Sequence, residues 1–389
     1  MANYFIFPEK DTTLYSHPDR KGLNAGRDEI LELVKEKGST DSFHYPSRIL
    51  IKFDIADIKI AIEKMGTVPA SASLKFNDGT SKVYLQLTAM EAKNLVTTFN
   101  IETHPVSQSW DEGTGKYSNI PTGSNGGSWF YRDNSINKTQ WTTASFGDGS
   151  TGSVSSSIVT AGGGVWYTGS GFEATQQFKI GDDLSTNLEV TDIIQKWSAS
   201  FYAGQTYPEG IDNQGFIIME PKSIEANTSG SSGEMQYFST DTHTIYPPKL
   251  VFKWDDSSYT AGSNIKTSGD LNVILYNLKK EYNQNEEANL KVHVRDRYPT
   301  RTFVTSSNFL DTGYFNSTSY YSIRDGHTEE VVVPFDDTYT KLSANGDGMY
   351  FKLYMKALQP ERYYRILLKH INNDGTTIYD NKYIFKVIR

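Results

Sequence analysis

The chain has 389 residues, of which 37% are hydrophobic and 22% charged, so it is long enough for two domains and apolar enough for packed cores. Its net charge is −8, and neither the part up to Asp255 (21 basic, 30 acidic) nor the remainder (17 basic, 16 acidic) carries the basic excess that nucleic acid binding needs. The lack of cysteine excludes disulfides, thiolate metal sites and cysteine nucleophiles.

The first residues, MANYFIFPEKDTT, contain neither a basic segment nor an apolar run as long as those of signal peptides. No stretch approaches the roughly 18 consecutive apolar residues of a transmembrane helix. We therefore expect synthesis in the cytoplasm without a signal peptide, and no membrane span.

Alternation of apolar and polar residues predicts strands in the first part of the chain. The segment 46–58 (PSRILIKFDIADI) is typical of a half-buried strand. The segments 72–77 and 82–87 predict a hairpin around an Asn-Asp-Gly-Thr turn. Both helix and strand fit 28–38, and we favour a strand. Further strands are predicted over 215–219, 235–240 and 249–254.

Two other segments of this part differ in texture. Thr88 and Glu91 form a capping-box pattern, which predicts a short helix over 88–96. Residues 115–175 are rich in Gly, Ser, Thr and Asn. This composition predicts either a long Gly/Ser/Trp loop that serves as a docking arm or several short strands joined by generous turns.

The last third of the chain has strand-like segments at regular spacing. A small polar stretch, 256–266, predicts a linker before it. The segments are LNVILYNL, ANLKVHVRD, TFVTS, YYSIR, EEVVVPF, MYFKLYMKA, YYRILLKHI and TIYDNKYIFKVI. Such short, evenly spaced strands predict an all-β domain, an Ig-like antiparallel β-sandwich over 267–389.

Few residue patterns are typical of a metal or cofactor site. The seven histidines match no metal-binding spacing, and no nucleophile elbow, Walker A or dinucleotide fingerprint occurs. Three clusters offer the oxygen ligands that Ca²⁺ prefers, but none follows the EF-hand pattern, and turn chemistry also accounts for them. They are Asp182-Asp183, Asp336-Asp337 and Asn345-Gly346-Asp347. We expect no catalytic, cofactor-binding or metal residue, with Ca²⁺ left open.

The stretch 107–119 (SQSWDEGTGKYSN) places Asp111 and Glu112 beside Trp110. Paired carboxylates act in glycosidases, but they flank the bond from different strands, whereas adjacent residues on a strand point to opposite faces. The pattern therefore favours a turn over a catalytic pair, and we expect no enzyme.

Aromatic residues of the Gly-rich segment are the candidates for stacking on sugars or for contact with a partner. Packing in a core or at a contact between subunits is the alternative that we favour for the tryptophans. The candidates are Trp129, Trp141, Trp166, Tyr131 and Tyr167.

Nine short blocks follow one another over about residues 11–254. They are Asp11–Thr13, Asn24–Gly26, Arg48–Asp54, Ala72–Leu74, Val106–Gly113, Val190–Trp197, Asn213–Ile218, Phe238–Asp241 and Pro248–Val251. This order resembles the DNRLRE domain family. The resemblance implies a jelly-roll β-sandwich over 1–255 and a mostly non-catalytic role in surface proteins, with polysaccharide binding in some relatives. The chain departs from the family at Phe238–Asp241, where an Arg-bearing segment is typical, and in its longer loop.

The whole chain also resembles virion structural proteins of T4-like marine phages, the cyanophages in particular. That resemblance implies a structural protein of the neck, tail or baseplate, with other virion proteins and copies of itself as partners and host surface glycans left open. The alternatives are a carbohydrate-binding adhesin or fibre module and a polysaccharide-degrading enzyme.

Overall fold

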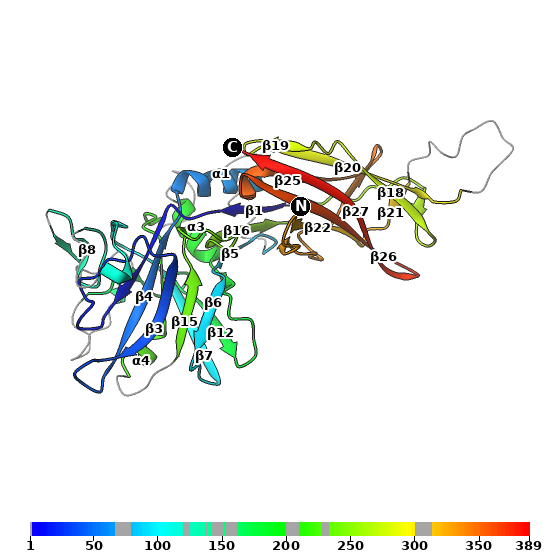
Figure 1. The fold of residues 1–389 in the computed structure, drawn as a ribbon. Helices are drawn as coiled ribbons and strands as arrows, with labels where there is room; N and C mark the ends of the chain where they lie inside the picture. Colours follow the sequence, from blue (N-terminus) through cyan, green and yellow to red (C-terminus); the bar gives the residue numbers. More distant parts are fainter. Residues whose placement is uncertain are drawn as a thin grey trace. The chain divides into compact units, whose positions relative to one another are not determined.

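The computed structural model describes residues 2–66, 79–119, 125–136, 138–141, 151–152, 162–199, 210–227, 233–299 and 313–389. The chain forms two compact units (Figure 1). One comprises Ile6–Val251, the other Phe252–Arg389 together with Met1–Phe5. Both consist mainly of antiparallel strands, which confirms the prediction of an all-β chain.

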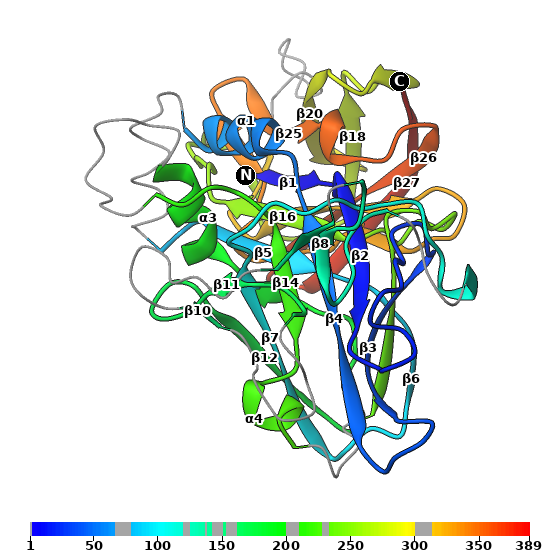
Figure 2. The same ribbon diagram turned by 90° about the vertical axis from the view of Figure 1, so that its left-hand side faces the viewer.

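The unit Ile6–Val251, called here the N-unit, is built on one large antiparallel sheet. Its strands follow the order β12-β7-β14-β4-β3-β15-β6, and β2 also pairs with β4. Figure 2 shows β7, β14 and β4 side by side, as their pairings require. The strands are β2 (Lys10–Tyr15), β3 (Ile30–Lys37), β4 (His44–Lys52), β6 (Ala89–Lys93), β7 (Thr98–Pro105), β12 (Ala174–Lys179), β14 (Phe216–Met219) and β15 (Glu234–Phe238). The strand favoured for 28–38 is confirmed by β3.

The strand predicted over 46–58 is only partly correct. β4 ends at Lys52, and the helix α1 (Ile55–Met65) follows, capped by the Asp54 carboxylate, which accepts a hydrogen bond from the backbone N–H of Ala56. β4 is also buried on both faces, since Arg48, Leu50 and their neighbours are shielded from solvent. Half-burial was expected from the alternation, but Arg48 is a buried cation rather than a surface one.

The helix predicted over 88–96 is wrong. β6 occupies this segment and pairs with β15, so that Lys93 lies opposite Glu234. The carbonyl of Thr88, which a helix would use, accepts the backbone N–H of Phe238 instead. Cross-strand partners thus override the local capping pattern.

Shorter elements complete the N-unit. Five of them, η1 and β8 to β11, interrupt the segment predicted as a long loop, in agreement with the alternative of short strands with turns. The strand predicted over 72–77 lies outside the described residues. The elements are β5 (Lys82–Gln86), η1 (Tyr117–Asn119), β8 (Tyr131–Asp133), β9 (Thr139–Gln140), β10 (Thr151–Gly152), β11 (Trp166–Tyr167), β13 (Leu188–Glu189), α3 (Thr191–Ala199) and α4 (Lys222–Glu225).

The other unit, called here the C-unit, is a two-layer sandwich. Its sheets follow the orders β18-β20-β25-β24 and β19-β27-β26-β22-β23, an Ig-like arrangement in agreement with the prediction. The layers meet where Tyr321 stacks on Phe351, with ring centroids 4.6 Å apart. The strands are β18 (Leu271–Tyr276), β19 (Glu281–Asn283), β20 (Glu287–Asp296), β22 (Ser319–Asp325), β23 (Val331–Val333), β24 (Ser343–Asn345), β25 (Gly348–Tyr354), β26 (Arg362–Asn372) and β27 (Gly375–Ile388).

The remaining elements lie at the boundary or the edge of the C-unit. The division between the units falls within β1 (Ala2–Ile6) and β16 (Lys249–Trp254). Part of the stretch 256–266, predicted as a linker, is structured instead: Tyr259 forms a parallel bridge with Ala344, and β17 (Ile265–Lys266) pairs with β21 (Tyr314–Phe315). A short helical turn, η2 (Met355–Ala357), follows β25. The predicted segment TFVTS lies outside the described residues.

Candidate functional site

Trp110, the aromatic residue beside the two carboxylates, is a packed side chain. It is only 4% exposed, and its indole Nε1–H donates to the carbonyl of Gln214 at 2.9 Å. The ammonium of Lys10 lies 4.4 Å from the centroid of its ring and donates to its backbone carbonyl. The ring face is therefore covered by protein and offers no platform for a ligand.

The neighbouring acids have separate surroundings. Asp111 is exposed, while its backbone N–H and carbonyl bond to the Arg132 carbonyl and the Gly127 N–H. Glu112 is half-buried and accepts the backbone N–H of Asp11 at 3.2 Å. The two acids thus have different partners and lie outside the strands, and the expectation that they do not act on one bond as a pair stays a prediction.

Arg27 forms ion pairs with Glu112 and with a second carboxylate, Asp241, which lies near the end of the N-unit in sequence. Its guanidinium lies 3.4 Å from an oxygen of Glu112 and 3.2 Å from Oδ1 of Asp241. Arg27, from the N-terminal part of the chain, thus connects the stretch after Trp110 to the segment that contains Asp241.

Asp11 is the most perturbed acid of this group. It is 1% exposed, and its Oδ2 accepts the backbone N–H of Thr240 at 2.7 Å and the hydroxyl of the same residue at 2.6 Å. Burial raises the pKa of Asp11 to about 7 and also raises the pKa of Glu112. A carboxyl with this pKa suits acid–base chemistry, but Asp11 is enclosed by the protein, so its role here is to tie chain segments together.

The three clusters considered as Ca²⁺ ligands in the sequence each have a side-chain oxygen that accepts backbone N–H groups of its own turn. Asp182 Oδ2 accepts the N–H of Lys179, Asp336 Oδ1 accepts the N–H groups of Thr338 and Tyr339, and Asn345 Oδ1 accepts the N–H of Asp347. In the part of the chain that the structure describes, no three His, Asp or Glu side chains are grouped so that they could hold a metal ion.

The tryptophans of the predicted arm lie in the core of the N-unit. Trp129 and Trp166 are fully buried and Trp141 is 7% exposed; all three belong to one hydrophobic cluster. The guanidinium of Arg48 lies 4.6 Å from the Trp129 ring and 4.9 Å from the Trp166 ring. These rings therefore do not offer a free face to a sugar, and the packing alternative describes them.

A fully buried ion pair completes this cluster. The Arg48 guanidinium donates to both carboxylate oxygens of Glu225, with the shortest distance at 2.7 Å, and to the Gly163 carbonyl at 2.6 Å. Gly163 has a φ of +76°, and a Cβ there would meet Arg48 and Trp129 at 2.7 Å. From the sequence, glycines 162–164 indicate only flexibility. In the structure they allow the backbone to pass close to Trp129, Arg48 and Ile217, where a Cβ would not fit.

The two candidate tyrosines are half-buried. Tyr131 pairs with Gln140 on β9 and its ring lies 6.3 Å from that of Phe130. Tyr167 stacks on Phe172 with centroids 5.4 Å apart. Each ring thus has a protein neighbour, and no contact between the two tyrosines is among those described.

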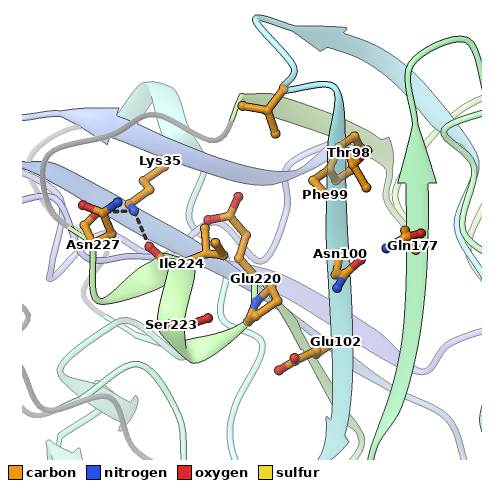
Figure 3. A pocket seen from close by; sticks show the side chains of 12 residues that line it. Lys35, Thr98, Phe99, Asn100, Glu102, Gln177, Glu220, Ser223, Ile224 and Asn227 are labelled. Atoms are coloured by element: carbon orange, nitrogen blue, oxygen red, sulfur yellow. Dashed lines mark hydrogen bonds between the residues drawn. The ribbon is translucent and has the colours of Figure 1, made fainter.

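A pocket that the sequence did not predict lies where β7, β12 and the short helix α4 meet (Figure 3). Its volume is about 500 Å³. Thr98, Asn100 and Glu102, alternating along β7, contribute one side, and Lys35 and Glu220 contribute the other. The alternation of polar residues in TFNIETH (98–104) was the available signal, but it marks any solvated strand face.

Lys35, on the side of the pocket opposite β7, is held by two hydrogen bonds. Its residue is 3% exposed, and its ammonium donates to the carbonyls of Ile224 and Asn227, as the dashed lines in Figure 3 show. Burial lowers the pKa of Lys35, while Glu220 and Glu225 act in the opposite direction. The lysine holds α4 and the residues after it in place on the sheet.

Comparison of the chain with protein-family models, with curated proteins and with solved structures found no match. The resemblances to the DNRLRE family and to phage virion proteins therefore stay predictions. None of the helices in the described ranges has the length and apolar character required to cross a membrane.

Proposed function

We propose that this chain is a non-catalytic structural protein of a tailed-phage particle, located in the neck, tail or baseplate. The main support is that the acids and tryptophans that suggest chemistry are engaged inside the fold. Asp11, Glu112 and Trp110 bond to other chain segments, and Trp129 and Trp166 enclose Arg48. The proposal that the particle is a phage rests on the resemblance of the chain to phage virion proteins.

In such an assembly many copies of the chain would each bury a small contact area, and the combined affinity of these contacts would exceed that of a single contact. Two β-sheet units, whose distant chain segments are joined by hydrogen bonds and ion pairs, are suitable rigid modules for such an assembly. The segment predicted as a docking arm contributes Trp129, Trp141 and Trp166 to the core. Deletion of 118–170 would therefore unfold the N-unit, and the docking surface must be sought elsewhere.

The test is an early stop codon in the gene, in a phage that can be grown with and without a suppressor. We expect particles made without suppression to lack part of the neck, tail or baseplate in electron micrographs, and infectivity to return with suppression. Complete, infectious particles without the protein would contradict the proposal.

A carbohydrate-binding module is the second candidate, and the pocket favours it. Phe99, Asn100 and Gln177 all line the pocket, and such a mixture of aromatic and amide groups suits a sugar ring with its hydroxyls. Binding of neutral oligosaccharides on a glycan array, lost in Phe99→Ala, would support this candidate. Absence of binding to every glycan would exclude it for this pocket.

A further inference from the structure

We infer that the pocket between β7, β12 and α4 binds a lysine or arginine side chain presented by a partner protein of the assembly. This inference rests on the proposed structural function and adds the chemistry of the partner. It follows from three features of the pocket: its acids, its hydrogen-bond acceptors and its apolar rim.

The first feature is an excess of negative charge. Of the residues that line the pocket, Glu102 and Glu220 are acidic and Lys35 is basic. The Lys35 ammonium already donates to two backbone carbonyls, so part of its hydrogen-bonding capacity is used by the protein. The Glu102 side chain is 19% exposed, and its Oε2 lies 3.7 Å from Nε2 of the buried His104. A cation thus completes the charge balance, whereas an anion does not.

The second feature is a surplus of acceptors. The side-chain oxygen of Asn100 is buried and has no hydrogen-bond partner among the described residues. Carboxylates accept hydrogen bonds without donating any when ionised, and Lys and Arg side chains donate without accepting. A guanidinium or ammonium group matches this set of acceptors more fully than a hydroxyl, which brings an acceptor of its own.

The third feature is the apolar rim, which favours a protein over a free small cation. Val96 and Ile224 line the pocket and are 42% and 41% exposed. Ile180, 76% exposed, bonds through its backbone N–H to Thr97, next to Val96. Phe99 is supported by Phe178, with stacked rings 5.1 Å apart. Such a rim packs against the methylene stem of Lys or Arg and against apolar neighbours in the partner.

The experiment uses the full chain and three capped amino acids as probes: N-acetyl-arginine methylamide, its lysine analogue and its norleucine analogue. Binding is measured by saturation-transfer NMR titration. We expect the arginine and lysine probes to bind and the norleucine probe, which has a similar stem without charge, to bind at least about tenfold more weakly. Equal binding of norleucine, no binding of any probe, or preference for a neutral oligosaccharide would each overturn the inference.

Single substitutions distinguish the contribution of the pocket acids to binding from any effect on the stability of the fold. Glu102→Gln is expected to weaken binding of the arginine probe about tenfold. The control is Glu173→Gln, which changes an exposed acid directly before β12 that does not line the pocket, and it should leave binding unchanged. Val96→Lys places a positive charge on the exposed rim without altering a buried group and should also weaken binding. Unchanged binding in both Glu102→Gln and Val96→Lys would contradict the inference.

The pocket and the proposed function can fail separately. If the protein is present in purified particles but does not bind the basic probes, the pocket inference fails and the structural function stands. If the protein binds the probes but particles form normally without it, the function fails and the pocket remains a site for cations on apolar stems.

Discussion

The two units bury polar groups in different ways. The N-unit holds charge in its interior: Arg48 and Glu225 form an ion pair with both side chains fully buried, and Asp11 bonds to Thr240. The C-unit has no counterpart of this pair among its described residues: its buried carboxylate, Asp325, accepts backbone N–H groups of its own turn and lies 3.7 Å from the partly exposed Arg362. The C-unit also buries His370, which is fully shielded and stacked on Phe315 with ring centroids 4.3 Å apart. Neither ring nitrogen of His370 has a hydrogen-bond partner among the described residues.

This difference follows from what each unit has to connect. The N-unit must fix long excursions of the chain, and charged hydrogen bonds join segments such as β4, α4 and the glycines 162–164. The C-unit has short connections between most of its strands, and its layers are held by contacts such as Tyr321 on Phe351. Stability of the N-unit should therefore depend on a few charged residues.

The largest effect is expected from Arg48→Met. The substitution leaves the Glu225 carboxylate buried without its partner, and we expect a loss of about 3–5 kcal/mol in the free energy of unfolding. Urea titration followed by tryptophan fluorescence measures it, since five of the six tryptophans lie in the N-unit. They are Trp110, Trp129, Trp141, Trp166 and Trp197.

Two controls accompany this prediction. Lys82→Met breaks the more exposed Lys82–Glu189 pair of the same unit and should change stability by no more than about 1 kcal/mol. The double variant Arg48→Met/Glu225→Leu removes both charges and should recover part of the loss. A loss below about 1 kcal/mol in Arg48→Met would show that the pair does not hold the unit together.

A somewhat smaller effect is expected from Gly163→Ala. Its Cβ would meet Arg48 and Trp129 at 2.7 Å in a backbone conformation with φ +76°, so we expect a loss of about 2–4 kcal/mol. Gly181→Ala is the matched control, because Gly181 has φ +93° and open space around it. It should lose only about 1 kcal/mol from backbone strain, and equal losses at both positions would refute the close-packing argument.

Asp11→Asn tests the pH dependence of the N-unit. The pKa of Asp11 is raised to about 7 in the folded chain, so its contribution to stability is fully present below pH 4 and is lost as the pH rises through 7. A shift of about three pKa units corresponds to about 4 kcal/mol at pH 8. The amide N–H groups of Asn, placed where Asp11 Oδ1 has no hydrogen-bond partner among the described residues, offset about half of this. Asp11→Asn should therefore stabilise the N-unit by about 2 kcal/mol at pH 8 and by little at pH 4. Urea titrations at the two pH values give the answer; a constant difference would exclude ionisation as the cause.

His370→Phe gives the smallest effect, with the opposite dependence on pH. Burial lowers the pKa of His370 to about 4, so its contribution to stability is present above pH 6.5 and is lost as the pH falls through 4. We expect His370→Phe to stabilise the C-unit by about 1 kcal/mol at pH 7 and by more at pH 5. Hydrogen exchange in β26 measures the change, and slower exchange in the wild-type chain at pH 5 would contradict it.

The sequence predicted strands well where period two was sustained and less well where local signals competed. Most of the predicted segments contain strands, as at β3, β14 and β18, whereas β19, β21 and β24 of the C-unit were not predicted. The helix α1 was missed although Ile58, Ala61, Ile62 and Met65 show helical spacing, because its first residues continue the alternation of β4. The capping pattern at 88–96 predicted a helix that does not form, because the pairing of β6 with β15 outweighs the local helix signal.

The site was less predictable because its parts are distant in sequence. Arg48 and Glu225 are separated by 177 positions, and nothing local marks either as half of a buried pair. The pocket combines residues from β3, β7, β12 and α4, so its composition depends on the topology of the sheet. Burial of the tryptophans was favoured by residue type, but their stacking on Arg48 was not foreseeable.

Quantitative mass spectrometry of phage particles purified on a density gradient tests the structural role in the particle directly. We expect this chain to band with the major particle proteins at a fixed ratio through successive purifications. A chain that stays in the soluble part of the lysate, or whose ratio falls with each purification, would contradict a structural role in the particle.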